Sequence, residues 1–226
     1  MADADRLLDR QRTEMVRTQI AGRGLDDPRL LRAFLAVPRE RFVDPVLAEW
    51  AYLDQPLPIG GGQTISQPYV VAVMADLLRL APGDRVLEIG TGSGYAAAIL
   101  AHLAGAVYSV ERQPELAAGA AERLAALGLA RVHVRCGDGT LGWPEHAPYD
   151  AIVVTAGGPV VPETLKAQLA VGGRLVMPVG ATVDEQALVR VTRTAGGAFT
   201  MEDFGPVRFV PLVGAEGWPD DGAAGW

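Results

Sequence analysis

The chain has 226 residues, 49% of them hydrophobic and 21% charged, and its formal net charge is −7 at pH 7. A chain of this length and composition can bury a sizeable core, which excludes an intrinsically disordered protein and indicates one folded domain. The acidic balance disfavours nucleic acid and anionic membranes as partners.

Cys136 is the only cysteine, so no disulfide can form within the chain, and we expect a reducing compartment, the cytoplasm. The first residues, MADADRLLDRQR, mix acids and bases with no apolar run, which is not the pattern of a signal peptide. Between Glu88 and Glu111 no residue carries a formal charge, but glycines and His102 interrupt this stretch. Its pattern changes from strand to helix to strand, which indicates a buried βαβ unit rather than a membrane span.

Three helices are predicted in the N-terminal part of the chain. The first covers residues 7–20, and the second begins at Pro28 and ends before Pro38. The third begins near Ser66, a candidate N-cap, with Pro68 in its first turn. Its apolar residues recur at helical spacing: Val70, Val73, Met74, Leu77 and Leu78.

From Arg85 onward, strands and helices alternate. Strands are predicted at 85–90, 106–111, 131–137, 149–157 and 173–180, and helices at 95–105, 114–128 and 162–173. Two further strands, at 186–194 and 206–214, have no helix between them. This order predicts an α/β fold with N-terminal helices and a mostly parallel, doubly wound, Rossmann-like sheet that ends in an antiparallel pair.

A glycine cluster, VLEIGTGSGY, follows the first of these strands and places Gly90, Gly92 and Gly94 before a helix. Ligands bind at the carboxyl ends of strands in such sheets, and glycine lets the backbone turn sharply against a ligand. A dinucleotide fingerprint, G-x-G-x-x-G, would need glycine at the position of Tyr95. The observed G-x-G-x-G spacing therefore favours a different ligand.

Three acidic residues accompany this cluster at the ends of successive strands. Glu88 precedes the glycines, Glu111 ends the next strand, and Asp138 follows the strand after that. A carboxylate at the position of Glu111 can accept both hydroxyls of a ribose, and Asp138 is placed to face an adenine. Three acids repel a pyrophosphate but attract a sulfonium and an ammonium, which favours S-adenosylmethionine. The alternative is that Glu88 and Asp138 only cap turns.

A second glycine cluster, GGGQTISQPY, occupies residues 60–69. Its glycines allow the segment to lie flat or to hinge over a site. The hydroxyl of Ser66 and the neighbouring backbone N–H groups at a helix N-terminus can bind a carboxylate. The three histidines of the chain are scattered, and none stands with a carboxylate or cysteine at metal-ligand spacing, so no metal site is expected.

Motifs along nearly the whole chain resemble the protein-L-isoaspartate (D-aspartate) O-methyltransferase family. They are VPRERFV, LPIGGGQTISQPY, VLEIGTGSGY, GDG, APYDAIVVTAG, GGRLVMPVG and VRFVPLVG. The resemblance implies a class I S-adenosylmethionine-dependent methyltransferase that methylates the free α-carboxylate of L-isoaspartyl residues, and by extension the β-carboxylate of D-aspartyl residues. Damaged proteins or peptides would be the partners, and the methyl ester would collapse to a succinimide and so begin repair.

The resemblance also implies roles for individual residues. Ser66 would be the catalytic residue that contacts the acceptor carboxylate, and residues 207–213 would close over the site. With the glycines and acids above, the expected cofactor-binding residues are Thr64, Ile65, Ser66, Glu88, Gly90, Gly92, Ser93, Gly94, Glu111, Arg112, Asp138 and Gly139. The expected substrate-binding residues are Ile59, Gly60, Ser66, Val210 and Pro211.

The end of the fourth core strand, VVTAGGP, offers Thr155 and small residues but no general base. An α-carboxylate with a pKa of about 3.5 is ionised near neutrality, so in-line methyl transfer requires positioning rather than a base. Three alternatives stay open: a related enzyme dedicated to one ribosomally made peptide, a nicotinamide oxidoreductase, and a non-catalytic adenosylmethionine-binding module. The glycine spacing disfavours the second, and the intact Ser66 loop disfavours the third.

We expect a monomer that forms a single methyltransferase domain over residues 1–226. Its expected parts are N-terminal helices with the substrate loop (1–80), a cofactor-binding core (81–180), C-terminal strands (181–214) and a tail (215–226).

Overall fold

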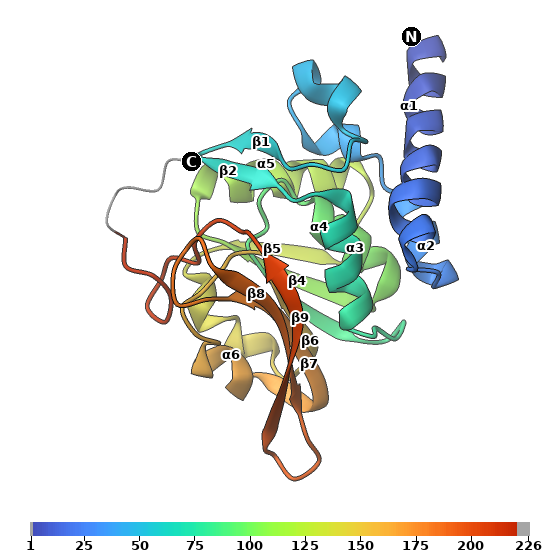
Figure 1. Cartoon of the computed structure of the whole chain (residues 1–226). Coiled ribbons are helices and arrows are strands. Elements are labelled where there is room, and N and C mark those ends of the chain that lie inside the picture. Colours follow the sequence, from blue (N-terminus) through green and yellow to red (C-terminus); the bar gives the residue numbers. More distant parts are fainter. Residues whose placement is uncertain (1, 221–226) are drawn as a thin grey trace.

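A computed structural model describes residues 2–220 of the chain, so residues 221–226 of the predicted tail lie outside the described residues. Its main sheet has seven strands in the order β5-β4-β3-β6-β7-β8-β9 (Figure 1). The first five of these in space are parallel, and β8 and β9 continue the sheet as antiparallel neighbours. The predicted fold class is therefore confirmed. The strands are β3 (Arg85–Ile89), β4 (Ala106–Glu111), β5 (Val132–Cys136), β6 (Tyr149–Val154), β7 (Leu169–Val179), β8 (Gln186–Arg193) and β9 (Phe199–Val207).

The parallel strands are apolar because both faces of the sheet are covered. Successive residues of β3 show this, since Val86 belongs to one apolar cluster and Leu87 to the other. The first cluster packs against α2, α3, α4 and α5, and the second against α6. Figure 1 shows these helices on the two sides of the sheet. The core helices are α4 (Tyr95–Leu103), α5 (Pro114–Ala126) and the short α6 (Glu163–Ala167).

The strand order reverses direction at β3, which has β4 on one side and β6 on the other. In an open parallel sheet, such a reversal leaves a crevice beyond the carboxyl ends of the two strands. The glycine cluster begins at this crevice, directly after Ile89. The topology therefore places the predicted ligand loop where the fold leaves room for a ligand.

The N-terminal region covers one side of the core. Helix α1 (Ala2–Met15) continues into a π-helical turn and a 3-10 turn, and α2 (Pro28–Ala36) follows. The carboxylate of Asp27 caps α2 by accepting a hydrogen bond from the backbone N–H of Arg29 at 2.7 Å. Two further 3-10 turns, Arg39–Phe42 and Pro45–Trp50, lead to a small hairpin of β1 (Leu57–Gly60) and β2 (Gln63–Ile65), and then to α3 (Pro68–Leu77).

Three predicted boundaries are wrong. Helix α3 has Gln67, not Ser66, as its N-cap, and that cap makes no side-chain hydrogen bond. The helix predicted at 162–173 ends at Ala167, because β7 already begins at Leu169 and pairs with β6. The last strand is β9, Phe199–Val207, rather than 206–214.

The misplaced last strand has a physical cause. As the edge strand of the sheet, β9 is largely exposed, so its sequence shows no apolar alternation. The apolar segment that follows it, residues 208–213, crosses the crevice instead of pairing as a strand. It is held by Gly157, whose N–H donates to the carbonyl of Val210 at 2.8 Å and whose carbonyl accepts from the N–H of Leu212 at 2.8 Å. Its apolar character therefore reflects burial in the crevice.

Candidate active site

A cleft of about 690 Å³ lies beyond the carboxyl ends of β3, β4 and β6. Residues from six separate parts of the chain line it: the β1–β2 hairpin, the glycine cluster, the turn after β4, the turn after β5, the end of β6, and the segment that follows β9. The lining residues are Gln63, Thr64, Ile89, Gly90, Gly92, Val110, Glu111, Arg112, Gln113, Gly139, Thr155, Ala156, Val210, Pro211, Leu212 and Val213.

The glycine cluster forms one wall of this cleft. Gly90, Gly92 and Gly94 have φ angles of 91°, 53° and 92°, which residues with a side chain rarely adopt. A Cβ atom on Gly90 would lie 2.5 Å from the Oγ1 atom of Thr155. Glycine is therefore required at Gly90 both by backbone conformation and by the close approach of the end of β6.

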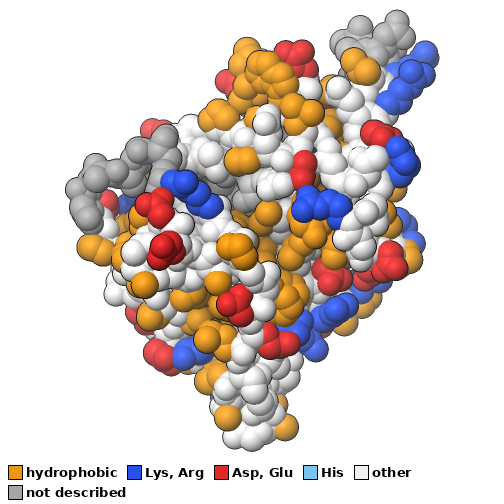
Figure 2. All heavy atoms as spheres, in the orientation of Figure 1, with side chains coloured by type: hydrophobic (Ala, Val, Ile, Leu, Met, Phe, Trp, Pro, Cys, Tyr) orange, Lys and Arg blue, Asp and Glu red, His pale blue; other side chains and the backbone are white. Residues whose placement is uncertain are grey.

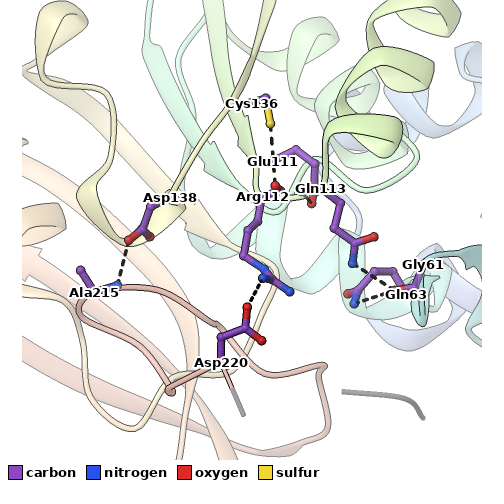
Figure 3. Close-up of polar contacts among 9 residues, drawn as sticks. All are labelled: Gly61, Gln63, Glu111, Arg112, Gln113, Cys136, Asp138, Ala215 and Asp220. Carbon is purple, nitrogen blue, oxygen red and sulfur yellow. Dashed lines mark hydrogen bonds and ion pairs between the residues drawn. The ribbon is translucent and has the colours of Figure 1, made fainter. Parts of the chain in front are cut away.

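Glu111 holds the glycine cluster in place. Its side chain is 6% exposed, and its two oxygens accept hydrogen bonds from the N–H groups of Gly92 and Gln113, each at 2.9 Å. A carboxylate offers about four lone-pair sites, so two backbone bonds leave capacity for hydroxyl groups in the cleft. Figure 3 shows Glu111, Arg112 and Gln113 side by side at the end of β4.

Glu88 lies below the cleft rather than on its wall. The side chain is fully buried and accepts a hydrogen bond from the hydroxyl of Ser109 at 2.5 Å. Burial raises the pKa of Glu88 to about 8, and the nearby carboxylate of Glu111 adds to the shift. Its Oε1 atom has no hydrogen-bond partner among the described residues.

Asp138 caps the short 3-10 turn at Gly139–Leu141. One carboxylate oxygen accepts from the N–H and the hydroxyl of Thr140, at 2.9 and 2.7 Å. The other accepts from the N–H of Ala215 at 2.8 Å, a contact drawn in Figure 3. Asp138 therefore caps this turn, and Gly139 beside it lines the cleft.

A second, wider cleft of about 1110 Å³ adjoins the first. Thr64, Thr155 and Val210 line both clefts and so form their shared boundary. Ser66 lines the second cleft, and its hydroxyl makes no hydrogen bond with another described residue. Figure 2 shows hydrophobic side chains gathered over the middle of this face, where α3 and the β8–β9 ribbon lie. The remaining lining residues are Pro56, Gln67, Val70, Pro206, Val207, Arg208 and Phe209.

Three further contacts connect the segments around the first cleft, as Figure 3 shows. The side-chain amide of Gln113 donates to the carbonyl of Gly61 at the tip of the β1–β2 hairpin, at 3.0 Å. The guanidinium of Arg112 forms an ion pair with Asp220 at 2.8 Å. The thiol of Cys136 donates to the carbonyl of Arg112 at 3.7 Å.

The predicted site residues fall into three groups. Those on the wall of the first cleft are Thr64, Gly90, Gly92, Glu111, Arg112, Gly139, Val210 and Pro211. Ser66 lines the adjoining cleft. Those that line neither cleft are Ile59, Gly60, Ile65, Glu88, Ser93, Gly94 and Asp138.

Sequence reasoning misses Gln113 as a site residue and names Thr155 only at a strand end without a general base, although both line the first cleft. Gln113 follows the strand-ending Glu111 by two residues, and Thr155 directly follows the fourth core strand. Position at a strand end is therefore an available signal for both. The family resemblance implies that residues 63–68 lie across the active site, and Gln63 does line the first cleft, although it is not among the expected cofactor- or substrate-binding residues.

Comparison with known proteins gives one consistent result. The family model described as protein-L-isoaspartate (D-aspartate) O-methyltransferase matches residues 10–217. A relative from Pelobacter propionicus, named protein-L-isoaspartate O-methyltransferase 2, is 61% identical over 208 residues, which cover 92% of each chain. A relative of the same family name from Rhodopseudomonas palustris strain CGA009 is 58% identical over 93% of this chain and 97% of its own.

Two solved structures agree with this result. One protein-L-isoaspartate O-methyltransferase matches with a TM-score of 0.81 and 31% identity, over 93% of this chain and 67% of its own. A crystal structure from Plasmodium falciparum in complex with S-adenosyl-L-homocysteine matches with a TM-score of 0.76 and 25% identity, over 89% and 97% of the two chains. The sequence and the fold together show that this chain belongs to the protein-L-isoaspartate (D-aspartate) O-methyltransferase family.

Proposed function

We propose that this protein transfers a methyl group from S-adenosylmethionine to the free carboxylate of isoaspartyl residues in proteins and peptides. The observation that carries the proposal is the pair of adjoining clefts, one with Glu111 on its wall and the other with Ser66. They meet at Thr64 and Thr155, so a donor in the first and an acceptor in the second would face each other across that boundary.

The residues of the first cleft fit the cofactor. Glu111 retains acceptor capacity toward the cleft and can bind the two hydroxyls of a ribose. Glu88 lies below the glycine cluster and has one buried oxygen without a partner among the described residues. Its raised pKa of about 8 keeps it largely protonated at neutral pH, so it contributes little negative charge. The carboxylate of Glu111 on the cleft wall favours a cationic ligand and opposes the pyrophosphate of a nicotinamide cofactor. When bound, S-adenosylmethionine supplies a methyl group activated by the positive charge on sulfur.

The second cleft fits an acceptor carboxylate. The hydroxyl of Ser66 is free to donate, because it makes no hydrogen bond with another described residue. The N-terminus of α3 begins two residues later and favours negative charge. Ser66 is therefore assigned the role of catalytic residue that holds the carboxylate at the boundary of the clefts.

No general base is needed for this reaction. The hydroxyl of Thr155 donates to the backbone carbonyls of Ile89 and Gly90, at 3.1 and 2.7 Å, so its proton is already held. An isoaspartyl α-carboxylate has a pKa of about 3.5 and attacks as the anion at neutral pH. The residues of the site contribute by orienting the two reactants, which can lower the barrier by about 7–11 kcal/mol.

The proposal extends to the cellular role. By resemblance to the family, the methyl ester would close spontaneously to a succinimide, which starts the repair of the damaged linkage, and D-aspartyl residues would be secondary acceptors. The protein is proposed to be a monomer and to act in the cytoplasm; the single cysteine, Cys136, is consistent with such a reducing compartment. No helix within residues 2–220 has the length and apolar character needed to cross a membrane.

A methyl-transfer assay tests the function. The purified protein receives methyl-labelled S-adenosylmethionine and one of two peptides that differ only in an isoaspartyl or a normal aspartyl linkage. We expect label in the isoaspartyl peptide alone. Equal labelling of both peptides, or none in either, would remove the substrate assignment. The peptides carry an arbitrary sequence around the linkage. Methylation of such a peptide would indicate a general repair enzyme rather than an enzyme dedicated to one peptide.

A further inference from the structure

The N-terminus of α3 is stabilised by a residue from outside the helix. Its N-cap, Gln67, makes no side-chain capping bond, although the first N–H groups of a helix need acceptors. A carboxylate oxygen of Asp54 accepts from the backbone N–H of Tyr69 at 3.1 Å. Asp54 therefore caps α3 from a position before the β1–β2 hairpin.

Asp54 makes two further contacts at the same place. Its other oxygen accepts from the side-chain amide of Gln67 at 2.7 Å and pairs with the guanidinium of Arg23 at 2.8 Å. The guanidinium of Arg23 also stacks over the ring of Tyr69, with 3.2 Å from Cζ to the ring centroid. Four side chains thus form one cluster around the start of α3.

The segment that carries Asp54 is itself fixed. Arg39 is fully buried, and its Nε atom donates to the carbonyl of Ala51 at 2.7 Å. A second, longer bond of 3.5 Å reaches the carbonyl of Gln55. The backbone on both sides of Asp54 is therefore tied to a buried side chain, which makes Asp54 a firm anchor.

These contacts join the two ends of the β1–β2 hairpin, which we call its stem. Asp54 lies just before β1, and Gln67 lies just after β2 and Ser66. The tip of the hairpin is held elsewhere, by Gln113 at the cofactor cleft. Stem and tip therefore have separate anchors, one on the acceptor side and one on the cofactor side.

We propose that Asp54 is a positioning residue for the acceptor, acting through Gln67 and the start of α3 to fix Ser66 at the boundary of the clefts. The inference rests on the proposed function of Ser66. Asp54 lines neither cleft, whereas Gln67 and Ser66 both line the acceptor cleft. Loss of the anchor frees the segment between the stem and the tip while the glycine cluster and Glu111 stay in place.

The test compares the full-length protein with three variants, Asp54→Ala, Asp54→Asn and Asp44→Ala. The carboxylate of Asp44 caps the turn Pro45–Trp50 by accepting from the N–H of Val46 at 3.0 Å, so it is a matched capping aspartate with a local contact. For each protein, kcat and KM are measured with the isoaspartyl peptide, and the Kd of S-adenosylhomocysteine is measured by calorimetry. Hydrogen exchange of the Tyr69 amide reports the cap without any substrate.

We expect Asp54→Ala to lower kcat/KM for the peptide by about 10- to 100-fold, because a displacement of about 1 Å near the reacting atoms costs that much. The Kd of S-adenosylhomocysteine should stay within about twofold, since the cofactor cleft has independent anchors. Asp54→Asn keeps the acceptor for Tyr69 and should stay within about fivefold of the wild type in kcat/KM, losing mainly a partly exposed ion pair. Asp44→Ala should keep the wild-type kcat/KM.

Wild-type kcat/KM in folded Asp54→Ala would overturn the proposal, and so would an equal loss in Asp44→Ala. Unchanged exchange of the Tyr69 amide in Asp54→Ala would also overturn it, whether or not the peptide is a substrate. A wild-type protein that labels no isoaspartyl peptide would instead contradict the proposed function, and the exchange experiment would still decide whether Asp54 caps α3. If Asp54→Ala does not fold, Asp54→Asn serves as the test. Its side-chain oxygen can still accept from the Tyr69 N–H, so loss of exchange protection at that amide would contradict the capping geometry.

Discussion

The two clefts of this protein are built in different ways. The cofactor cleft is formed by the ends of three parallel strands and by backbone turns whose glycines are fixed by φ angles and close packing. The acceptor cleft is assembled from the hairpin stem, the adjoining start of α3 and the segment around the end of β9, which comes much later in the chain. Single side chains such as Asp54 and Gln186 hold those pieces together.

Gln186 illustrates the second mode of construction. It is 5% exposed, its side-chain oxygen accepts from the N–H of Phe209 at 2.9 Å, and its amide donates to the carbonyl of the same residue at 3.0 Å. One side chain of β8 thus fixes a segment that lines the acceptor cleft. We therefore expect substitutions on the cofactor side to disturb backbone turns that local geometry fixes. Substitutions on the acceptor side should instead increase the mobility of segments that single side chains hold in place.

The largest effect is expected at the cofactor cleft, from Glu111→Ala. The change removes the proposed ribose acceptor and leaves the N–H groups of Gly92 and Gln113 without their shared partner. Hydrogen bonds to a charged group contribute about 1.5–3 kcal/mol each, so the Kd of S-adenosylhomocysteine should rise at least about 100-fold. Calorimetry measures this directly. Glu115→Ala, an exposed acid in the first turn of α5, is the control and should bind as the wild type does.

Ser66→Ala should give the opposite pattern. Removal of the hydroxyl should lower kcat/KM for the isoaspartyl peptide by about 5- to 150-fold, the equivalent of about 1–3 kcal/mol for one lost hydrogen bond to a charged group. The Kd of S-adenosylhomocysteine should change little, because Ser66 lines only the acceptor side. Steady-state kinetics and calorimetry on the same preparation measure both quantities. An equal loss of cofactor affinity would show that the two clefts are not separable.

The same contrast explains what the sequence can predict. The cofactor side depends on local patterns: a strand, the G-x-G-x-G turn, a helix, and an acid at the end of the next strand. These patterns predict that Gly90, Gly92 and Glu111 share one site, and all three line the cofactor cleft. These residue types are required by the local backbone geometry, so the sequence of each short segment is enough to predict its part of the site.

The acceptor side cannot be predicted in the same way. Residue type favours Ser66 as the N-cap of α3, but Gln67 occupies the position and the cap comes from Asp54, a contact across 15 residues. The apolar character of the segment after β9 predicts a strand, yet the segment is apolar because it fills the crevice. Both errors arise where tertiary contacts replace local preference.

Glu88 allows a pH-dependent effect on stability, rather than on binding, to be tested on the cofactor side. Its folded-state pKa of about 8 lies above the ordinary value of 4.5, so between these pH values the folded protein holds a proton that the unfolded chain has released. The free energy of unfolding should therefore fall as the pH rises through this window, by at most about 1.4 kcal/mol per pH unit. Glu88→Gln should remove this slope and gain stability relative to the wild type toward pH 8.

Denaturant unfolding of the cofactor-free proteins across that pH range measures the effect. The quantity to compare is the difference between the two slopes, because other groups titrate equally in both proteins. Parallel slopes would mean that Glu88 is ionised in the folded state. In that case its buried oxygen would have a partner outside the described protein atoms, such as a water molecule.

The smallest effect is expected from Asp220→Asn at the rim of the cofactor cleft. The ion pair with Arg112 joins side chains that are 40% and 60% exposed, and such pairs contribute about 0–1 kcal/mol. Two backbone contacts also hold the same segment, through Ala215 and through Trp218, whose N–H donates to the carbonyl of Leu212 at 2.7 Å. The Kd of S-adenosylhomocysteine should therefore rise by at most about fivefold at low salt.

The salt dependence of the Kd shows whether this ion pair contributes to cofactor binding. At about 1 M salt the screening length falls to about 3 Å, so the difference between Asp220→Asn and the wild type should vanish. Asp184→Asn is the control, since Asp184 forms a pair with Arg208 on the acceptor side in which each side chain is 64% exposed. Asp184→Asn could weaken cofactor binding as much as Asp220→Asn does. The ion pair between Arg112 and Asp220 would then have no local effect on the cofactor cleft, and the two clefts would not be energetically separate.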